Sequence, residues 1–319
     1  MGYKQKRVVV LGRVDAYYSH FLYGALEGSI LNGAWAKNVQ LVGRNIKDIK
    51  EEIDFMKPHY LICHMVFGPL RQDVLHYFTE LRNKYGTKIC YHMGDARTIP
   101  RYPHDISRFV DLGLVNHGEH ENFSYIWNIP CIHWPYMAFN QQDIADVDPR
   151  FEGGLAFTGD LLASKHHGPR RNFINSIKNI LPIKLYPTPE TGNTRFLTSE
   201  ISSSADGVLG MQMGMNINLY QDVRPFQYCG AGALYFHDQC EAMDIFFEPY
   251  VHYIPYKRDN PRDLKEKFDE YTNNKEKGYK IRREGFEFCQ RYHSSKQRME
   301  SIFNYFEGKD LLPIYKDEL

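Results

Sequence analysis

The stretch that decides the fold is residues 216–253, NINLYQDVRPFQYCGAGALYFHDQCEAMDIFFEPYVHY. It places Arg224 in a proline-containing turn, ahead of the small residues 230–233. The apolar run 234–236 follows and leads to Asp238. Because glycine and alanine carry little or no side chain, such a patch lets a backbone approach another group closely. The order of these features is typical of a turn beside a short buried strand in an α/β domain.

Two interpretations of this stretch stay open on spacing alone. In the first, it forms a phosphate-and-sugar site at the carboxyl ends of strands, because a helix N-terminus can hold an anion on its free N–H groups. A nearby cation such as Arg224 suits a diphosphate better than a neutral ligand. In the second, it is a packed helix whose glycines only allow close contact with a neighbour.

The composition of the whole chain sets limits on the class of protein. At 319 residues it suits two domains of about 150 residues each. Hydrophobic content of 43% and charged content of 24% are ordinary for a soluble globular protein. The 39 Lys and Arg balance the 39 Asp and Glu, so no global basic excess points to nucleic acid, although a local basic patch is compatible with it.

Targeting and metal-binding signals are weak. The sequence contains no stretch of about 18 apolar residues, so no membrane span is predicted. The N-terminal segment is too short and too polar for a signal peptide. We therefore expect a cytoplasmic protein (host cytoplasm if viral). The terminal run 316–319, KDEL, spells a retention signal that we interpret as coincidental. The six cysteines form no CxxC pair and predict free thiols. His166 and His167 lack a partner at ligand spacing, so no metal site is predicted.

Strands and helices alternate through the first half. Continuous apolar runs such as 7–11, RVVVL, are typical of strands buried on both faces of a parallel sheet. The expected strands are 7–11, 39–42, 60–64, 88–92, 114–117 and 131–134. The expected helices are 19–32, 45–56, 74–85 and 122–127. This alternation predicts an open parallel sheet.

Polar residues cluster just after these strands. The carboxyl ends of parallel strands line the ligand crevice of an open α/β sheet. The residues expected along that edge are Gly12, Arg13, His64, Gly94, Asp95, His117, Glu119 and His133.

The second half begins a new α/β unit after a polar, loop-like segment. We expect strands at 155–157 and 182–186, and helices at 165–180, 261–273, 277–292 and 296–306, with one short helix inside the loop 188–205. The predicted division is a domain at 1–140, a linker at 141–154, a second domain at 155–295, and a helical tail at 296–319 that packs back on the first domain.

A set of short motifs runs through the second half of the chain: Arg224-Pro225-Phe226, Gly232-Ala233-Leu234, Asp238, Phe247-Glu248-Pro249, Gly285 and Tyr292-His293, with Phe157-Thr158-Gly159, Arg170 and Arg171 at its start. In these motifs the chain resembles a glycosyltransferase of the GT-B type, and most of all the group 1-like domain of the spore-maturation (CgeB-like) family. The resemblance implies two Rossmann-like domains with parallel sheets facing a central cleft. It also implies a nucleoside diphosphate sugar as co-substrate and no tightly bound cofactor or metal.

Three positions depart from the family pattern. The family's Glu after Arg-x-Phe is Gln227, which can still hydrogen-bond a hydroxyl but carries no charge. An earlier Glu of the pattern falls at Leu219, and the Gly after Phe-Glu-Pro is Tyr250.

On this resemblance the second domain holds the donor. Arg224 is the first choice for the diphosphate, because a guanidinium fork fits phosphate oxygens in two places at once. Gly159 is a backbone approach point, and Arg170 or Lys165 is a second cation, although Arg170 also fits a solvated helix start. The donor-binding residues expected are Gly159, Arg170, Arg224, Gln227, Gly232 and Asp238.

The first domain is expected to hold the acceptor. Asp95 follows a buried strand and a glycine, and it fits a general base for the acceptor hydroxyl as well as a capping residue in a turn. The acceptor-side residues expected are Gly12, Arg13, His92, His117 and Glu119. Tyrosines near the crevice, Tyr228 among them, fit core packing better than sugar stacking.

The predicted function is transfer of a sugar from a nucleoside diphosphate sugar to a hydroxyl. The acceptor is a small molecule, a protein, a polysaccharide or a hydroxymethylated DNA base, and the sequence does not decide among them. A modest basic cluster in the first domain is compatible with the DNA acceptor. The cluster is Lys88, Arg97, Arg101, His104 and Arg108. The alternative is a non-catalytic nucleotide-binding or structural spore or virion module with a degenerate transferase fold, which Gln227 keeps open.

Overall fold

The computed structural model describes residues 5–12, 20–40, 43–65, 72–93, 106–159, 161, 168–188, 197–212 and 218–316. The chain divides into two compact units, and neither is continuous in sequence. Unit 1 comprises residues 1–137, 217–220 and 295–312. Unit 2 comprises residues 138–216, 221–294 and 313–319.

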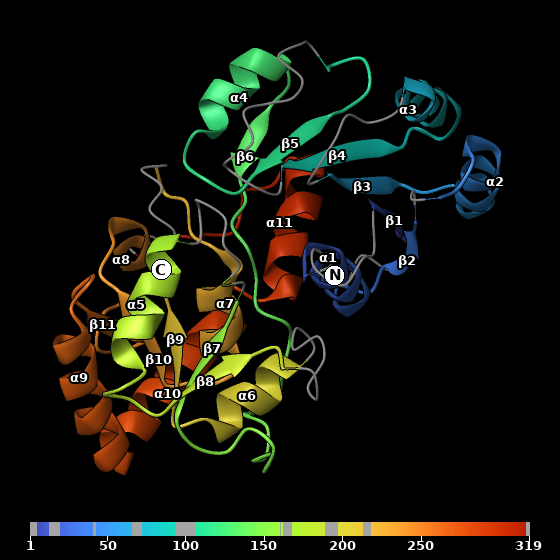
Figure 1. The fold of residues 1–319 in the computed structure, drawn as a ribbon. Helices are drawn as coiled ribbons and strands as arrows, with labels where there is room; N and C mark the ends of the chain where they lie inside the picture. Colours follow the sequence, from blue (N-terminus) through green and yellow to red (C-terminus); the bar gives the residue numbers. More distant parts are fainter. Residues whose placement is uncertain are drawn as a thin grey trace. The chain divides into compact units, whose positions relative to one another are not determined.

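Unit 1 is built on a six-stranded sheet of order β2-β1-β3-β4-β5-β6 in which all neighbours are parallel (Figure 1). The strands are β1 (Arg7–Gly12), β2 (Trp35–Val39), β3 (Tyr60–Met65), β4 (Lys88–Met93), β5 (Leu112–Val115) and β6 (Cys131–His133). The helices are α1 (His20–Leu31), α2 (Ile46–Met56), α3 (Gln72–Tyr85), α4 (His120–Trp127) and α11 (Ser295–Phe306). The predicted open parallel sheet is confirmed.

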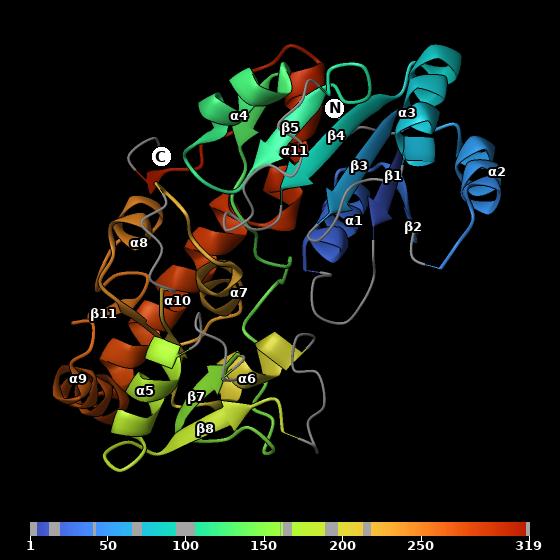
Figure 2. The ribbon, with the colours of Figure 1, turned by 45° about the horizontal axis from the view of Figure 1, so that its top comes forward.

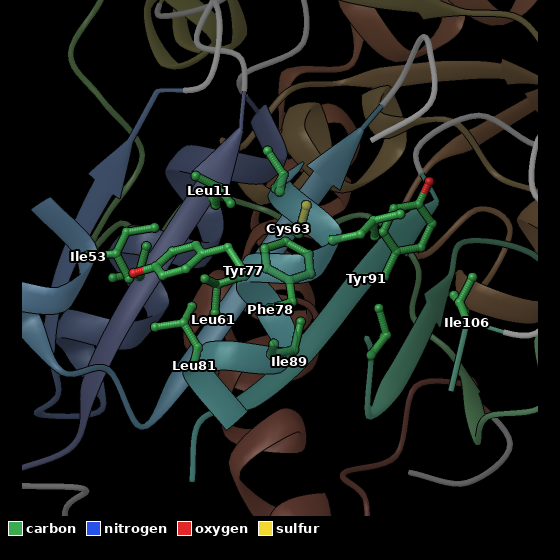
Figure 3. Packing of buried hydrophobic residues seen from close by; sticks show 14 of the residues in the cluster. Leu11, Ile53, Leu61, Cys63, Tyr77, Phe78, Leu81, Ile89, Tyr91 and Ile106 are labelled. Carbon is green, nitrogen blue, oxygen red and sulfur yellow. The ribbon is translucent and has the colours of Figure 1, made fainter. Parts of the chain in front are cut away.

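Each face of this sheet has its own apolar core. Side chains alternate along a strand, so Val9 and Leu11 pack under α2, α3 and α4, while Val8 and Val10 pack under α1 and α11. Figure 3 shows part of the first core, in which Tyr77 and Phe78 of α3 meet strand residues. Helices α1 and α11 pack side by side (Figure 2).

Two strands of unit 1 begin earlier than predicted. The apolar run 39–42 suggested a strand, but β2 is Trp35–Val39. β2 is an edge strand with one fully buried residue, so its sequence needs no continuous apolar run. The prediction followed the apolar run 39–42 and therefore placed the strand too late in the sequence. Similarly, β5 is Leu112–Val115 rather than 114–117, because His117 already lies beyond the end of the strand.

Unit 2 is built on a five-stranded parallel sheet of order β11-β10-β9-β7-β8. The strands are β7 (Leu155–Thr158), β8 (Ile183–Tyr186), β9 (Gly207–Gly210), β10 (Tyr235–Asp238) and β11 (Ile254–Tyr256). The helices are α5 (Gly168–Ile177), α6 (Thr198–Ser204), α7 (Val223–Gly230), α8 (Glu241–Phe246), α9 (Pro261–Asn273) and α10 (Lys275–Tyr292). Helices α5 and α9 pack against one face of this sheet and share an apolar core with it. Helix α7 contacts β9 and β10.

The small-residue patch of the deciding stretch ends helix α7. Gly232 has φ +79°, and a Cβ on it would lie 2.5 Å from a side-chain carbon of Ile144. A Cβ on Gly230 would lie 2.4 Å from the Cβ of Ala138. The glycines therefore serve a left-handed turn and a close packing contact.

In the described part of the chain, no helix is long and apolar enough to cross a membrane. All six cysteines are described, and none forms a disulfide. No group of three or more potential His, Cys, Asp or Glu metal ligands occurs among the described residues.

Candidate functional site

The candidate donor site lies at the carboxyl edge of the unit 2 sheet. The parallel register pairs His237 of β10 with Gly210 of β9, and pairs β9 in turn with β7, which ends at Thr158. Three adjacent strands therefore end together, as the carboxyl ends of parallel strands do at ligand sites. Helix α7 packs against β9 and β10.

Arg224 is held at this edge by two oxygens. Its Nε donates to the carbonyl oxygen of Thr158 at 2.9 Å, and its Nη1 lies 2.5 Å from Oδ2 of Asp222. Its side chain keeps 18% of its area exposed, so the guanidinium is mostly buried but still reachable. This combination of a fixed direction and partial access suits a phosphate-binding arginine.

Local sequence explains how α7 presents Arg224. Asp222 is the N-cap residue, and its Oδ1 accepts from the backbone N–H of Arg224 at 2.9 Å. Pro225 lies in the first turn, where its missing N–H costs no intrahelical hydrogen bond. The Asp-x-Arg-Pro order therefore starts the helix and aims the guanidinium together.

Gly159 lies directly under this guanidinium. A Cβ on Gly159 would come 2.8 Å from Nη2 of Arg224, and the residue has φ +159°. Its N–H donates to the carbonyl oxygen of Tyr186 at 3.2 Å. The structure thus brings together Gly159 and Arg224, two of the predicted donor residues.

Asp238 has its carboxylate occupied by three groups of unit 2. Its Oδ1 accepts from the backbone N–H of Gln212 at 2.7 Å, and its Oδ2 lies 2.6 Å from Nε of Arg258. His237 Nδ1 lies 3.2 Å from Oδ1. Burial alone would lower the pKa of His237, but a hydrogen bond with Cys240 and the charge of Asp238 raise it to about 9. Asp238 therefore fixes the ends of β9 and β10.

The other predicted donor residues are buried. Arg170 is 5% exposed with its guanidinium 5.7 Å from the ring centroid of Phe157, so the solvated helix-start interpretation of Arg170 is wrong. Gln227 is also 5% exposed, on α7. Gly232 faces Ile144 in the turn after that helix. Lys165 lies outside the described residues.

Unit 1 has a histidine-rich edge at the ends of β5 and β6. Nδ1 of His117 accepts from the backbone N–H of Glu119 at 3.2 Å, so its proton is on Nε2. The rings of His120 and His133 stack with centroids 6.0 Å apart. Burial lowers the pKa of His117 to about 4, and burial with His120 and Arg298 lowers that of His133 to about 3. The imidazoles of His117 and His133 are therefore neutral at pH 7.

The remaining acceptor-side residues divide between core and undescribed segments. Gly12 is the last residue of β1. In the parallel register it lies opposite His64 of β3, another residue predicted for this edge. His92 is fully buried, and its ring stacks on Phe21 at a centroid distance of 4.1 Å, so it packs in the core. Arg13 and Asp95 lie outside the described residues.

Comparison with known structures fits this architecture. A glycosyltransferase from Rickettsia africae has a TM-score of 0.60 at 10% identity, covering 96% of this chain and 99% of that chain. HepE from Anabaena, solved with UDP and glucose, has a TM-score of 0.60 at 8% identity, covering 95% and 100%. Sucrose-phosphate synthase from Thermosynechococcus elongatus has a TM-score of 0.56 at 7% identity, covering 95% and 99%.

The fold is GT-B. Residues 200–304 also match the model of a glycosyl transferase-like family, a segment that contains Arg224 and the whole of α7. No curated protein matches the chain. The family match and the GT-B fold together support a glycosyltransferase enzyme.

Sequence reasoning missed the partners of the predicted residues. Asp222 could have been found as an N-cap two residues before Arg224. Arg258 gave no signal, because its contact with Asp238 joins positions 20 residues apart. The hydroxyl of Tyr228, which pairs with Oγ1 of Thr158, gave none either.

Proposed function

We propose that this protein transfers a sugar from a nucleoside diphosphate sugar to a hydroxyl acceptor, with the donor diphosphate bound by Arg224. The observation that supports the proposal is the placement of Arg224 over Gly159, in the first turn of α7, at the carboxyl edge of a sheet. The helix N-terminus and the guanidinium both favour an anion there. HepE, a protein of similar fold, was solved with UDP and glucose, so uridine diphosphate donors are the first to test.

Binding of the donor tests the proposal directly. Calorimetric titration with the uridine, adenosine, guanosine and cytidine diphosphates, free and as glucose conjugates, should give one preferred nucleotide. Arg224→Ala should weaken that affinity by about tenfold or more, since a hydrogen bond to a charged group contributes about 1.5–3 kcal/mol. Arg283→Ala is the matched control, because Arg283 is an arginine of unit 2 that pairs with Asp143 and Glu287 on the exterior.

The outcome separates two functions. Binding that survives Arg224→Ala unchanged would contradict the proposed diphosphate contact. Binding without turnover, for any acceptor supplied, would favour the alternative of a non-catalytic nucleotide-binding module, which Gln227 in place of a glutamate keeps open. The absence of both nucleotide binding and sugar turnover would exclude the glycosyltransferase function.

The acceptor and the subfamily are finer proposals. The sequence motifs Arg224-Pro225-Phe226 and Phe247-Glu248-Pro249 support a spore-maturation (CgeB-like) relative. Hydroxymethylated DNA is one acceptor to supply with labelled donor, beside polysaccharide, protein and small molecules.

Asp95 is the proposed general base on the sequence alone. Asp95→Asn should keep donor binding and lose transfer of the labelled sugar, because the amide cannot take the proton of the acceptor hydroxyl. Unchanged transfer would remove Asp95 from that role.

A further inference from the structure

Thr158 links two residues of helix α7 at the candidate donor site. Its carbonyl oxygen accepts from Nε of Arg224 at 2.9 Å, while its hydroxyl pairs with the hydroxyl of Tyr228. Arg224 and Tyr228 are four residues apart and therefore lie one above the other on the same helix face. The end of strand β7 is thus attached to α7 at two points, and one of them fixes the guanidinium.

Tyr228 is held rigidly at this position. It is 4% exposed, and its ring stacks on that of Tyr235 with centroids 6.1 Å apart and planes 13° apart. Burial raises the pKa of Tyr228 to about 12, so the phenol is protonated at pH 7. A buried hydroxyl costs free energy unless it is hydrogen-bonded, and Thr158 supplies that bond.

We propose that the Tyr228 hydroxyl is a positioning residue for Arg224: through Thr158 it sets the direction in which the guanidinium meets the donor diphosphate. This inference rests on the proposed function. The hydroxyl holds the side chain of Thr158, the residue whose carbonyl oxygen receives Nε of Arg224. A Cβ on the adjoining Gly159 would lie 2.8 Å from Nη2 of Arg224, so the guanidinium lies close over the backbone that follows Thr158, and a rotation of that backbone displaces it.

Packing alone would need only the ring of Tyr228. Tyr228→Phe keeps the ring and its stacking on Tyr235 but removes the hydroxyl. A purely structural role therefore predicts an unchanged donor affinity in this variant once its folding is verified by the thermal midpoint. The positioning role predicts a weaker affinity at a similar midpoint.

A double-mutant cycle tests whether the effect acts through Arg224. The dissociation constant of UDP, or of whichever nucleoside diphosphate binds best, is measured by calorimetry for the wild type, Tyr228→Phe, Arg224→Lys and the double variant. Arg224→Lys keeps the charge but cannot reproduce the two-point contact. Tyr256→Phe is the control, because Tyr256 is a buried tyrosine whose hydroxyl donates to the carbonyl oxygen of Gly210 at 3.0 Å.

We expect Tyr228→Phe to weaken binding about fivefold in the wild-type background, the effect of one lost hydrogen bond, and by less than about twofold beside Arg224→Lys. Equal affinities for wild type and Tyr228→Phe would overturn the inference while leaving the proposed function intact. A fivefold loss in both backgrounds would also overturn it, because the hydroxyl would then act independently of Arg224. A wild-type protein that binds no nucleoside diphosphate would refute the proposed function itself.

Discussion

The carboxyl edges of the two sheets differ in charge, and one histidine from each illustrates the difference. His133 ends β6 in unit 1 beside His120 and Arg298, and its pKa falls to about 3. His237 lies in β10 of unit 2 beside Asp238, and its pKa rises to about 9. Burial lowers the pKa of both side chains, and at His237 the hydrogen bond with Cys240 and the charge of Asp238 reverse that shift. At pH 7 the first ring is neutral and the second is charged.

The difference extends to the other residues of each edge. In unit 2 the carboxylates of Asp222 and Asp238 pair with Arg224 and Arg258. In unit 1 the described edge contains the buried His117, with its proton on Nε2. Paired charges at an edge can be rearranged around a phosphate, whereas neutral imidazoles suit uncharged hydroxyls. The proposed assignment of the donor to unit 2 and the acceptor to unit 1 agrees with this contrast.

The largest expected effect comes from removing the charge at Asp238. Asp238→Asn leaves the buried His237 and the guanidinium of Arg258 without their carboxylate. We expect the free energy of unfolding to fall by about 3 kcal/mol, as measured by urea denaturation at pH 7. Gln212 keeps an acceptor, since the amide oxygen of asparagine replaces Oδ1.

Asp111→Asn is the matched control in unit 1. Asp111 also accepts a backbone N–H, that of Ile89 at 2.8 Å, and pairs with Arg82 at 3.0 Å, but no histidine shares its carboxylate. We expect a loss of about 1 kcal/mol there. Equal losses at the two sites would mean that the charge on His237 adds nothing to the stability of unit 2.

A second expected effect is a pH dependence of opposite sign in the two edges. The pKa of His237 in the folded state lies above the unfolded value near 6.5, so its contribution is complete below pH 6.5 and is lost as pH rises through about 9. The pKa of His133 lies below the unfolded value. Its neutral form therefore favours folding above pH 6.5, and stability declines as pH falls towards 3.

Two variants separate these slopes. His237→Gln should flatten the fall in the free energy of unfolding between pH 7 and 9, and His133→Gln should reduce the fall between pH 6 and 4. Denaturant titrations at five or six pH values would measure both. An alkaline slope that persists in His237→Gln would contradict the charge assigned to that edge.

Sequence patterns predicted the strands with long apolar runs but missed β9 and β11 of unit 2. The run RVVVL identified β1, but the central β9 of unit 2 is only GVLG and was not predicted. Its two glycines do not favour a strand by their own propensity. Packing requires a glycine at position 210, because a Cβ there would lie 2.0 Å from the hydroxyl oxygen of Tyr235. Only the neighbouring strands explain why β9 is a strand.

The candidate site was predictable in part for a similar reason. Arg224 could be selected because it follows a turn and precedes a patch of small residues. The hydrogen bond from Arg224 to Thr158 joins positions 66 residues apart, and that between Tyr228 and Thr158 joins positions 70 apart. Such contacts exist only after β7 and α7 pack, and neither residue's local sequence encodes them.

The discontinuous course of the chain has a consequence for protein engineering. Helix α11 belongs to unit 1, where Met299, Ile302 and Phe303 are fully buried against one face of the sheet, yet α11 follows all of the unit 2 helices in sequence. A fragment cut after residue 140 would therefore leave that apolar face uncovered. Under the proposed assignment of the acceptor to unit 1, recombining donor and acceptor specificities between homologues requires exchanging the C-terminal helix together with the first half of the chain.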